Sequence, residues 1–579
     1  MVLAVYSLLA LWLTRPLVWH IFDSSLVDYL PTRFDIPLCT WVLSWDTHAL
    51  TTRPSALFDA NIYHPAPDAL AYTEHMLGSV PFFAPVYLAT GNPALGLNVM
   101  ILCGLVLSAA GTYLLVLRWT GSHTAAFFSG LVFGFYPAHL RATGPNLQTL
   151  QYFPMILWAL DAVLAGGGPG ATAGLGVALL GQCLASFYYA YPAVLATVAA
   201  AGALCLTRRS RPSRGALLRV AAAVCFAGVA MALVSRPYFR VAARGQRGTI
   251  YVLNALFGAI RMPVLEMIGA SLTLLGPAPV VLAIVGACSG LWRGTDDRTR
   301  RRVVILLVWI LVGHLLFVGR TLGVAQYSIA MPSRLLIAYL PGFSALRDRR
   351  RFLVLVAAAG SVLAGMGLAA LGARFPSRYR QWIAPVALAT AATLGLALGV
   401  SLRPCSLVDL PTGARVPDVY RALAARPPGP VLELPVGATT RAKIAPLLQA
   451  QYEYFSTFHW RPLLNGYASY WPGGFENAMK LARALPRALA LRELVACAGL
   501  RWIVLHTDRL DAADIEAWQR LEGVDPPERF GADLLFHVTL PPPAGGCREE
   551  LYPETLRSDA TPGAGAALRS NEPVASQAG

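Results

Sequence analysis

The sequence has few charged side chains for its length. Only 13% of its 579 residues are Asp, Glu, Lys or Arg, whereas 56% are hydrophobic and the mean hydropathy is +0.52. A soluble globular protein carries roughly 25% charged residues. This shortage excludes a soluble single-domain, collagenous or disordered chain. It predicts a protein that faces lipid over much of its surface.

The sequence also lacks the motifs of nucleotide-driven chemistry. It contains no Walker A loop, no G-x-S-x-G elbow, no kinase signature and no H-E-x-x-H. Its histidines and acids do not have the spacing of a zinc site. No metal site and no cofactor are therefore predicted, and a requirement for a divalent cation is left open.

The net positive charge is confined to the apolar part of the chain. Residues 403–579 hold 18 basic and 19 acidic residues, so the net charge of +16 arises within residues 1–402. This distribution is typical of cytoplasmic loops in a membrane protein. No basic run is interleaved with aromatic residues, so no nucleic-acid partner is predicted.

About eleven apolar runs are long enough to cross a hydrocarbon core about 30 Å thick. They lie near residues 1–20, 93–117, 124–140, 148–165, 171–188, 190–207, 216–234, 270–292, 303–319, 352–373 and 382–401. The sequence therefore predicts a polytopic α-helical membrane domain over residues 1–402.

Arginines in alternate connections fix the predicted orientation. They are Arg118, then four within 208–214, five within 293–302 and three within 374–380. The positive-inside rule places these connections in the cytoplasm. The loop 21–92 and the tail from residue 403 then lie outside the cytoplasmic membrane.

Beyond residue 403 the composition becomes that of a soluble domain. Short buried-strand patterns at 431–434, 502–506 and 534–540, with helical patterns at 418–425 and 488–498, predict an extracytoplasmic α/β domain over 403–540. Residues 541–579 have the composition of a disordered tail. Four cysteines fall on the oxidising side in this topology, with their pairing left open: Cys39, Cys405, Cys497 and Cys547.

The first external loop concentrates the acidic residues of the membrane half. Seven of the twelve acids in residues 1–402 lie there: Asp23, Asp28, Asp35, Asp46, Asp59, Asp68 and Glu74. At about 70 residues the loop is longer than a connector requires. One helical face of residues 38–50 is apolar, which predicts a helix along the membrane interface. Two interpretations remain: an interfacial loop with solvated acids, or an active-site loop that carries carboxylates.

A second cluster, in the external loop 320–351, is rich in arginine. It contains Arg334, Arg347, Arg349, Arg350 and Arg351, which oppose the positive-inside trend. Planar guanidinium groups suit phosphate recognition. The cluster is interpreted either as a clamp on a lipid-linked phosphate or as a contact to lipid headgroups.

The first loop contains a series of motifs at residues 34–38 (FDIPL), 45–50 (WDTHAL), 58–65 (FDANIYHP) and 70–75 (LAYTEH). Further motifs stand at 135–137 (FYP), Gln148, 340–341 (LP), 345–347 (ALR) and 351–352 (RF), and in the tail at 433–435 (ELP) and 459–467 (HWRPLLNGY). Together these motifs resemble a group of bacterial membrane proteins placed in the GT-C superfamily of glycosyltransferases that use lipid-phosphate sugars. Protein O-mannosyltransferases and the aminoarabinose transferase of lipid A are related members. The resemblance covers most of the chain.

The sequence departs from the group's pattern in three places. Phe34 stands where a Gly usually precedes the first Asp, Asn146 stands where a His is usual, and Arg349 stands where a Pro is usual. The second departure puts any role for that His in doubt.

The resemblance implies the activity and its site. A sugar would pass from a polyprenyl-phosphate donor in the outer leaflet to a glycan, lipid or protein acceptor, with Asp35 as the first candidate for the catalytic carboxylate and Glu74 as the second. A carboxylate can accept the proton of the nucleophile, and arginines can stabilise the departing phosphate. The residues expected to bind substrate are Asp46, His48, His64, His75, Arg334, Arg347, Arg351, His459 and Asn465.

Two other functions stay open. A lipid or polysaccharide transporter could use the same arginine loop, although it would need polar residues along several spans. A GT-C scaffold without activity could bind a glycolipid. For Asp35 the competing interpretation is a cap on the helix that starts near Leu38.

Overall fold

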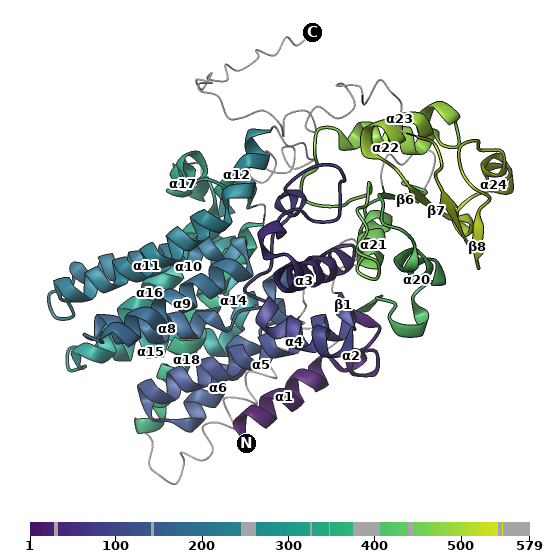
Figure 1. Ribbon diagram of the computed structural model, residues 1–579. Helices are drawn as coiled ribbons and strands as arrows, with labels where there is room; N and C mark the ends of the chain where they lie inside the picture. Colours follow the sequence, from purple (N-terminus) through teal and green to yellow (C-terminus); the bar gives the residue numbers. More distant parts are fainter. Residues whose placement is uncertain are drawn as a thin grey trace, which may run out of the picture.

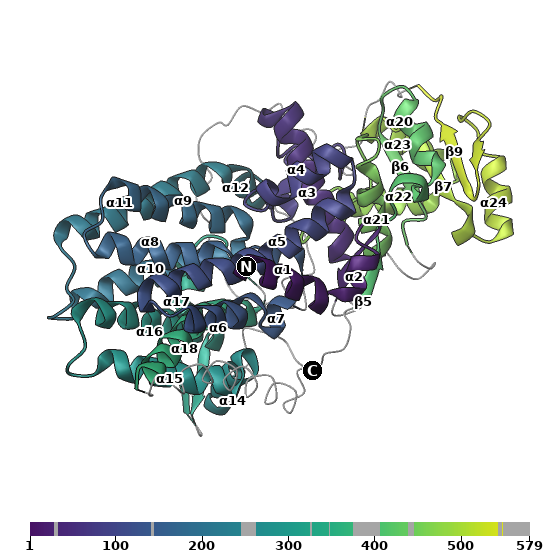
Figure 2. The ribbon, with the colours of Figure 1, turned by 90° about the horizontal axis from the view of Figure 1, so that it is seen from below.

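The computed structural model describes residues 1–27, 33–140, 144–244, 262–324, 327–346, 348–374, 406–437, 445–541 and 547. Helices from the first two thirds of the chain form a bundle. A small sheet flanked by helices lies beyond one end of the bundle, and the segment around α3 lies between them (Figures 1 and 2).

The predicted apolar runs coincide with helices, except for 382–401, which lies outside the described residues. The helices are α1(Val2–Leu13), α5(Pro93–Thr120), α6(His123–Gly134), α8(Tyr152–Leu164), α9(Pro169–Ala185), α10(Phe187–Cys205), α11(Arg214–Val234), α14(Val264–Leu275), α15(Pro277–Leu291), α16(Asp297–Val318) and α18(Val354–Arg374). Among the described residues, five helices are long and apolar enough to span a membrane. A sixth span results if α14 and α15, between which the chain bends by 106°, count as one broken span. The chain is thus a largely helical membrane protein, and the number of eleven spans stays a prediction.

Helix α18 lies at the centre of the bundle. Its residues 354–368 are all buried, and it packs closely on α15 through glycines. A Cβ atom added at Gly367 would lie 1.9 Å from the Leu282 carbonyl oxygen, and one added at Gly286 would lie 2.2 Å from that of Leu363. Small residues let two apolar helices approach at backbone distance, which is how helices associate in lipid.

The arginine-rich connection 293–302 binds the ends of two other helices of the bundle. The Asp161 carboxylate at the end of α8 binds Arg301 (3.0 Å) and Arg302 (2.9 Å) at the start of α16. Arg302 also donates to the Trp119 carbonyl oxygen at the end of α5 (3.4 Å). These contacts join the helix ends that the positive-inside rule assigns to one side.

The first loop is folded and packed rather than spread on a surface. It contains β1(Ser24–Val27), α3(Asp35–Thr52), the short 3-10 helices η2(Pro54–Ala56) and η3(Ala69–Tyr72), and α4(Val80–Thr90). The expectation that one apolar face of residues 38–50 lies along the membrane interface is wrong. Leu43 and Asp46, which do not belong to that face, are also fully buried, because α3 packs against α4, α5 and the C-terminal helix α21(Pro446–Ser456).

The C-terminal region contains the predicted strands and helices. The sheet has the order β6(Val431–Leu434), β7(Trp502–His506), β9(Asp533–His537) and β8(Glu528–Phe530), with β6 and β7 parallel and the other pairs antiparallel. Its helices are α20(Asp418–Ala425), α21(Pro446–Ser456), α22(Phe475–Ala484), α23(Ala488–Ala498) and α24(Ala512–Gln519). Cys497 and Cys547 form a disulfide, and the Cys39 thiol is free. Cys405 and most of the predicted tail 541–579 lie outside the described residues.

The first loop and the C-terminal region share one apolar core. Strand β5(Ser406–Asp409) pairs antiparallel with β1, and the Tyr63 and His64 N–H groups donate to the carbonyl oxygens of Asn465 and Leu463. The buried Asn61 side chain accepts the Trp41 indole N–H (3.1 Å) and donates to Ser456 Oγ (3.1 Å). The two segments therefore fold against each other although they are far apart in sequence.

We expect Asn61→Ala to weaken this junction. The change leaves the buried Trp41 indole N–H without its acceptor, which typically costs about 1–3 kcal/mol. Thermal unfolding and limited proteolysis of the purified protein would report the loss. Gln519→Ala on the exposed face of α24 is the control, and equal stability of the two variants would show that Asn61 does not hold the junction.

Candidate functional site

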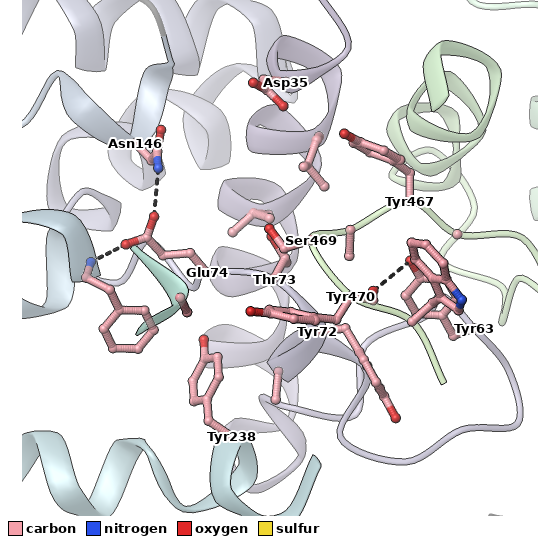
Figure 3. Close-up of a pocket in the computed structure, with 18 of the residues that line it drawn as sticks. Asp35, Tyr63, Tyr72, Thr73, Glu74, Asn146, Tyr238, Tyr467, Ser469 and Tyr470 are labelled. Carbon is pink, nitrogen blue, oxygen red and sulfur yellow. Dashed lines mark hydrogen bonds between the residues drawn. The ribbon is translucent and has the colours of Figure 1, made fainter. Parts of the chain in front are cut away.

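A cavity of about 1090 Å³ lies where the bundle, the first loop and the C-terminal region meet. Three sequence-predicted residues from separate segments line it: Asp35 at the start of α3, Glu74 after η3, and Arg351 in the 3-10 helix η6(Arg349–Leu353). Figure 3 shows Glu74 with Asn146 on one side and Tyr467 and Tyr470 on the other. The first loop thus supplies both candidate carboxylates to one cavity.

The Glu74 carboxylate accepts hydrogen bonds from three groups. Asn146 Nδ2 donates to one oxygen (2.7 Å), while Ser186 Oγ (2.9 Å) and the Phe187 N–H donate to the other. Phe187 is the first residue of α10, where backbone N–H groups have no partner within the helix. Burial raises the pKa of Glu74, and these three donors and then the nearby Arg351 charge oppose that shift.

Asn146 takes a direct part in this arrangement. The GT-C resemblance implies a His at this position, so the departure to Asn left its role in doubt. In the structure, the Asn146 amide donates a hydrogen bond to Glu74. An amide donates to the carboxylate without adding a charge that could titrate.

Asp35 is the first residue of α3 rather than its cap. Phe34 occupies the cap position, and its side chain makes no capping hydrogen bond. The half-buried Asp35 carboxylate lies at the positive end of the helix dipole, which favours negative charge. The Phe34 ring packs edge-on against Tyr467 (5.3 Å between centroids), so the start of α3 contacts the C-terminal region directly.

Arg351 is the arginine of the predicted cluster that lines the cavity. Its guanidinium lies 3.8 Å from the centroid of the Tyr188 ring, and its side chain is 23% exposed. The Asp348 carboxylate is 3.8 Å away. Arg334 is exposed on α17(Ser333–Tyr339) and does not line the cavity. Arg347 lies outside the described residues.

Six other predicted substrate-binding residues do not line the cavity: Asp46, His48, His64, His75, His459 and Asn465. The His48 ring stacks on Trp460 (4.1 Å). His75 is packed among Phe58, Phe187 and Tyr238, and burial lowers its pKa to about 4. These rings have packing partners instead of a place in the cavity.

The other members of this group hold backbone segments together. His64 precedes a cis proline, and its N–H donates to the Leu463 carbonyl oxygen (2.8 Å). His459 Nδ1 accepts the Arg461 N–H (3.0 Å). The Asn465 amide makes two hydrogen bonds to the backbone of Glu433 in β6 (2.7 and 3.0 Å). Within the described residues, no three His, Cys, Asp or Glu side chains gather as ligands of a metal ion would.

Several residues that line the cavity were not predicted from the sequence. Tyr188 and Tyr191 belong to an apolar helix pattern, and Tyr238 lies in the short helix α12(Arg236–Ala243). On the C-terminal side the cavity is lined by Ser469, Tyr470, Trp471, Glu476, Lys480 and Arg483. The match at 459–467 ends just before this segment, so the resemblance could have drawn attention to it.

Asp46 is fully buried in α3, where its Oδ2 accepts the Met76 N–H (3.0 Å). Burial raises its pKa to about 7, and that hydrogen bond opposes the shift. The folded protein therefore favours the neutral carboxyl. This stabilisation is complete below about pH 4, the ordinary range of an Asp, and is lost as the pH rises to about 7.

We expect Asp46→Asn to stabilise the protein relative to the wild type as the pH rises. Asn keeps an acceptor for the Met76 N–H and cannot ionise, so the difference should grow by about 1.4 kcal/mol per pH unit between pH 4 and 7 and then level off. Thermal unfolding in detergent at several pH values measures it. The exposed Asp508→Asn is the control, and a difference that does not change with pH would contradict a buried neutral Asp46.

No protein-family model matches the sequence, and no curated protein matches it. Among solved structures, the arabinofuranosyltransferase AftD from Mycobacteria is similar, with a TM-score of 0.54 and 17% identity. The match covers 94% of this chain and 40% of AftD, so this chain spans well under half the length of AftD.

ArnT from Cupriavidus metallidurans is less similar. Its apo structure has a TM-score of 0.41 and 13% identity, covering 86% of this chain and 93% of that one. Its structure bound to undecaprenyl phosphate gives 0.40 and 12%, with 88% and 97% covered. The AftD match shows that the chain has, over nearly its whole length, the fold of this arabinofuranosyltransferase, in agreement with the resemblance that the motifs indicated.

Proposed function

We propose that this protein transfers a sugar from a polyprenyl-phosphate donor to an extracytoplasmic acceptor. The observation that carries the proposal is the shared cavity, which brings two carboxylates of the first loop and one arginine of the 320–351 loop together. These are the groups that such a transfer needs: a proton acceptor for the nucleophile and a cation for the leaving phosphate.

The proposed reaction balances within this set. The acceptor's oxygen or nitrogen attacks the anomeric carbon and forms the new glycosidic bond, while the carbon–oxygen bond to phosphate breaks and the phosphate leaves with the electron pair. The proton of the nucleophile passes to the Asp35 carboxylate, or to Glu74 if Asp35 is not the base. Arg351 stabilises the charge that develops on the phosphate.

The cavity offers different chemistry at its two sides. On the bundle side lie Glu74, Arg351 and helices that could guide a lipid-linked donor. On the C-terminal side, aromatic and polar side chains of the segment 467–483 suit the acceptor. Tyr470 is held in place because its N–H donates to the Tyr72 carbonyl oxygen (3.1 Å). In chemical terms a glycan, a lipid and a protein are all suitable acceptors, because each presents hydroxyl or amine nucleophiles.

We place the cavity and the C-terminal region on the outer side of a bacterial cytoplasmic membrane. Asp161 at the end of α8 binds Arg301 and Arg302 of the arginine-rich connection 293–302, in agreement with one cytoplasmic end of the bundle. The disulfide between Cys497 and Cys547 supports an oxidising surrounding for the C-terminal region. An outer location also suits a donor that needs no nucleotide.

We expect Asp35→Asn to lower the transfer rate by about 10²- to 10⁴-fold, the usual cost of losing a general base. The variant should fold normally, because an asparagine side chain at this position still fits the first turn of α3. Loss of the acidic limb of the pH–rate profile in this variant would identify the base. If Asp35→Asn is nearly as active as the wild type, the base lies elsewhere.

Glu74→Gln tests whether Glu74, the second candidate, is the catalytic base. Because burial raises the pKa of Glu74, a Glu74 base would place the acidic limb above the ordinary Glu value of about 4.3, and activity would fall as the pH drops through it. Glu476→Gln, which removes a carboxylate from the other side of the same cavity, is the matched control. An equal loss of transfer rate in Asp35→Asn, Glu74→Gln and Glu476→Gln would indicate a general effect on the cavity rather than loss of a base.

We expect Arg351→Lys to weaken donor use. Lys keeps the charge but loses the planar fork and the stacking on Tyr188, and a charge-assisted hydrogen bond is worth about 1.5–3 kcal/mol. The donor KM should therefore rise about 10- to 100-fold. Arg334→Lys, outside the cavity, is the control, and an unchanged donor KM in Arg351→Lys and Arg351→Ala would reduce Arg351 to a structural contact.

A further inference from the structure

Tyr238, which also lines the cavity, contacts the segment that carries Glu74. Its hydroxyl oxygen accepts the N–H of His75, the residue after Glu74 (3.0 Å). Its ring meets the Phe187 ring nearly perpendicularly, with centroids 5.1 Å apart, and Phe187 donates its N–H to the Glu74 carboxylate. Tyr238 thus touches both the residue after Glu74 and one of the groups that bind its carboxylate; Figure 3 shows Tyr238 below Glu74.

The helix that carries Tyr238 is fixed to the same segment at a second point. Asp68, at the start of η3, is 4% exposed and binds Arg240 of α12 (2.9 Å to Nε) and the adjacent Arg244 (3.0 Å). Asp68 has a φ of 56°, a left-handed conformation that is uncommon for a residue other than Gly. Asp68 is buried while both arginines reach solvent, and loss of the arginines would leave an uncompensated buried carboxylate, so the pairing joins α12 to η3.

These contacts bracket Glu74 between two attachments to one short helix. Asp68 lies six residues before Glu74 and His75 lies directly after it. We propose that α12 clamps the segment 68–75 and that Tyr238 is a positioning residue for the Glu74 carboxylate. The inference rests on the proposed function, because it assigns the clamp to the transfer site.

The physical reason is the directionality of the three hydrogen bonds that Glu74 accepts. The donors at 2.7 and 2.9 Å hold the carboxylate only while the backbone of Glu74 keeps its position relative to Asn146 and α10. Without the Tyr238 hydroxyl, the His75 N–H loses its acceptor and the backbone beside Glu74 is released. The carboxylate then keeps its chemistry but loses its fixed place in the cavity.

Tyr238→Phe tests the clamp because it removes only the hydroxyl. We expect kcat to fall about tenfold with the donor and acceptor KM unchanged, and no further loss when the change is added to Glu74→Gln. Tyr152→Phe is the matched control, since the Tyr152 hydroxyl donates to the Gly78 carbonyl oxygen (2.9 Å) further along the same segment. It should lower thermal stability to a similar degree and leave kcat near that of the wild type.

A second measurement does not depend on transfer. The infrared carboxyl band that disappears in Glu74→Gln can be followed against pH in the purified protein. The ionisable groups whose charges reach Glu74 are Cys39 in α3, Tyr189 in α10, Tyr238 in α12 and Arg351 in η6. Because the three donors favour the ionised carboxylate, Tyr238→Phe should move the midpoint of this band to higher pH, and Tyr152→Phe should not.

The outcomes distinguish the two proposals. A wild-type protein without transfer activity, but with the shifted infrared midpoint in Tyr238→Phe, would overturn the proposed function and support the positioning of Glu74. Full additivity with Glu74→Gln, or an unshifted midpoint, would overturn the clamp. A raised donor KM in Tyr238→Phe alone would also overturn it, because Tyr238 would then bind substrate directly.

Discussion

A buried carboxylate needs hydrogen-bond donors, and the arrangement of the site depends on the donors that bind Glu74. Its donors come from Asn146, from Ser186 and from the first N–H of α10. None of these belongs to the first loop. The three hydrogen bonds to Glu74 therefore fix the first loop against two separate parts of the bundle. They also orient the cavity wall at that junction.

The cavity exists because the first loop is covered on its other side as well. Backbone hydrogen bonds between residues 61–64 and 463–465, and the pairing of β1 with β5, attach the C-terminal region to the loop. The result is one apolar core that includes residues from both parts. A loop that would be an interfacial segment by itself thus becomes a wall between membrane helices and a sheet.

Much of the helical pattern was predictable because apolar runs are local features. The helices 418–425 and 488–498 were predicted with the same bounds that the structure gives them. The surroundings of α3 were not predictable, because both of its faces are covered by segments far away in the sequence. Composition could mark Asp35, Glu74 and Arg351 as candidates, and the resemblance ranked them. It could not separate them from His48 or His75, whose rings pack against aromatic neighbours in the fold.

Charge balance suggests why the two carboxylates differ in setting. Glu74 is enclosed by donors and its pKa is raised by burial, whereas Asp35 begins a helix whose dipole favours an ionised group. The Arg351 guanidinium lies over the Tyr188 ring and 3.8 Å from the Asp348 carboxylate, and Arg351 lines the same cavity. In the proposed transfer, a carboxylate of the first loop would accept the proton of the nucleophile and Arg351 would stabilise the departing phosphate.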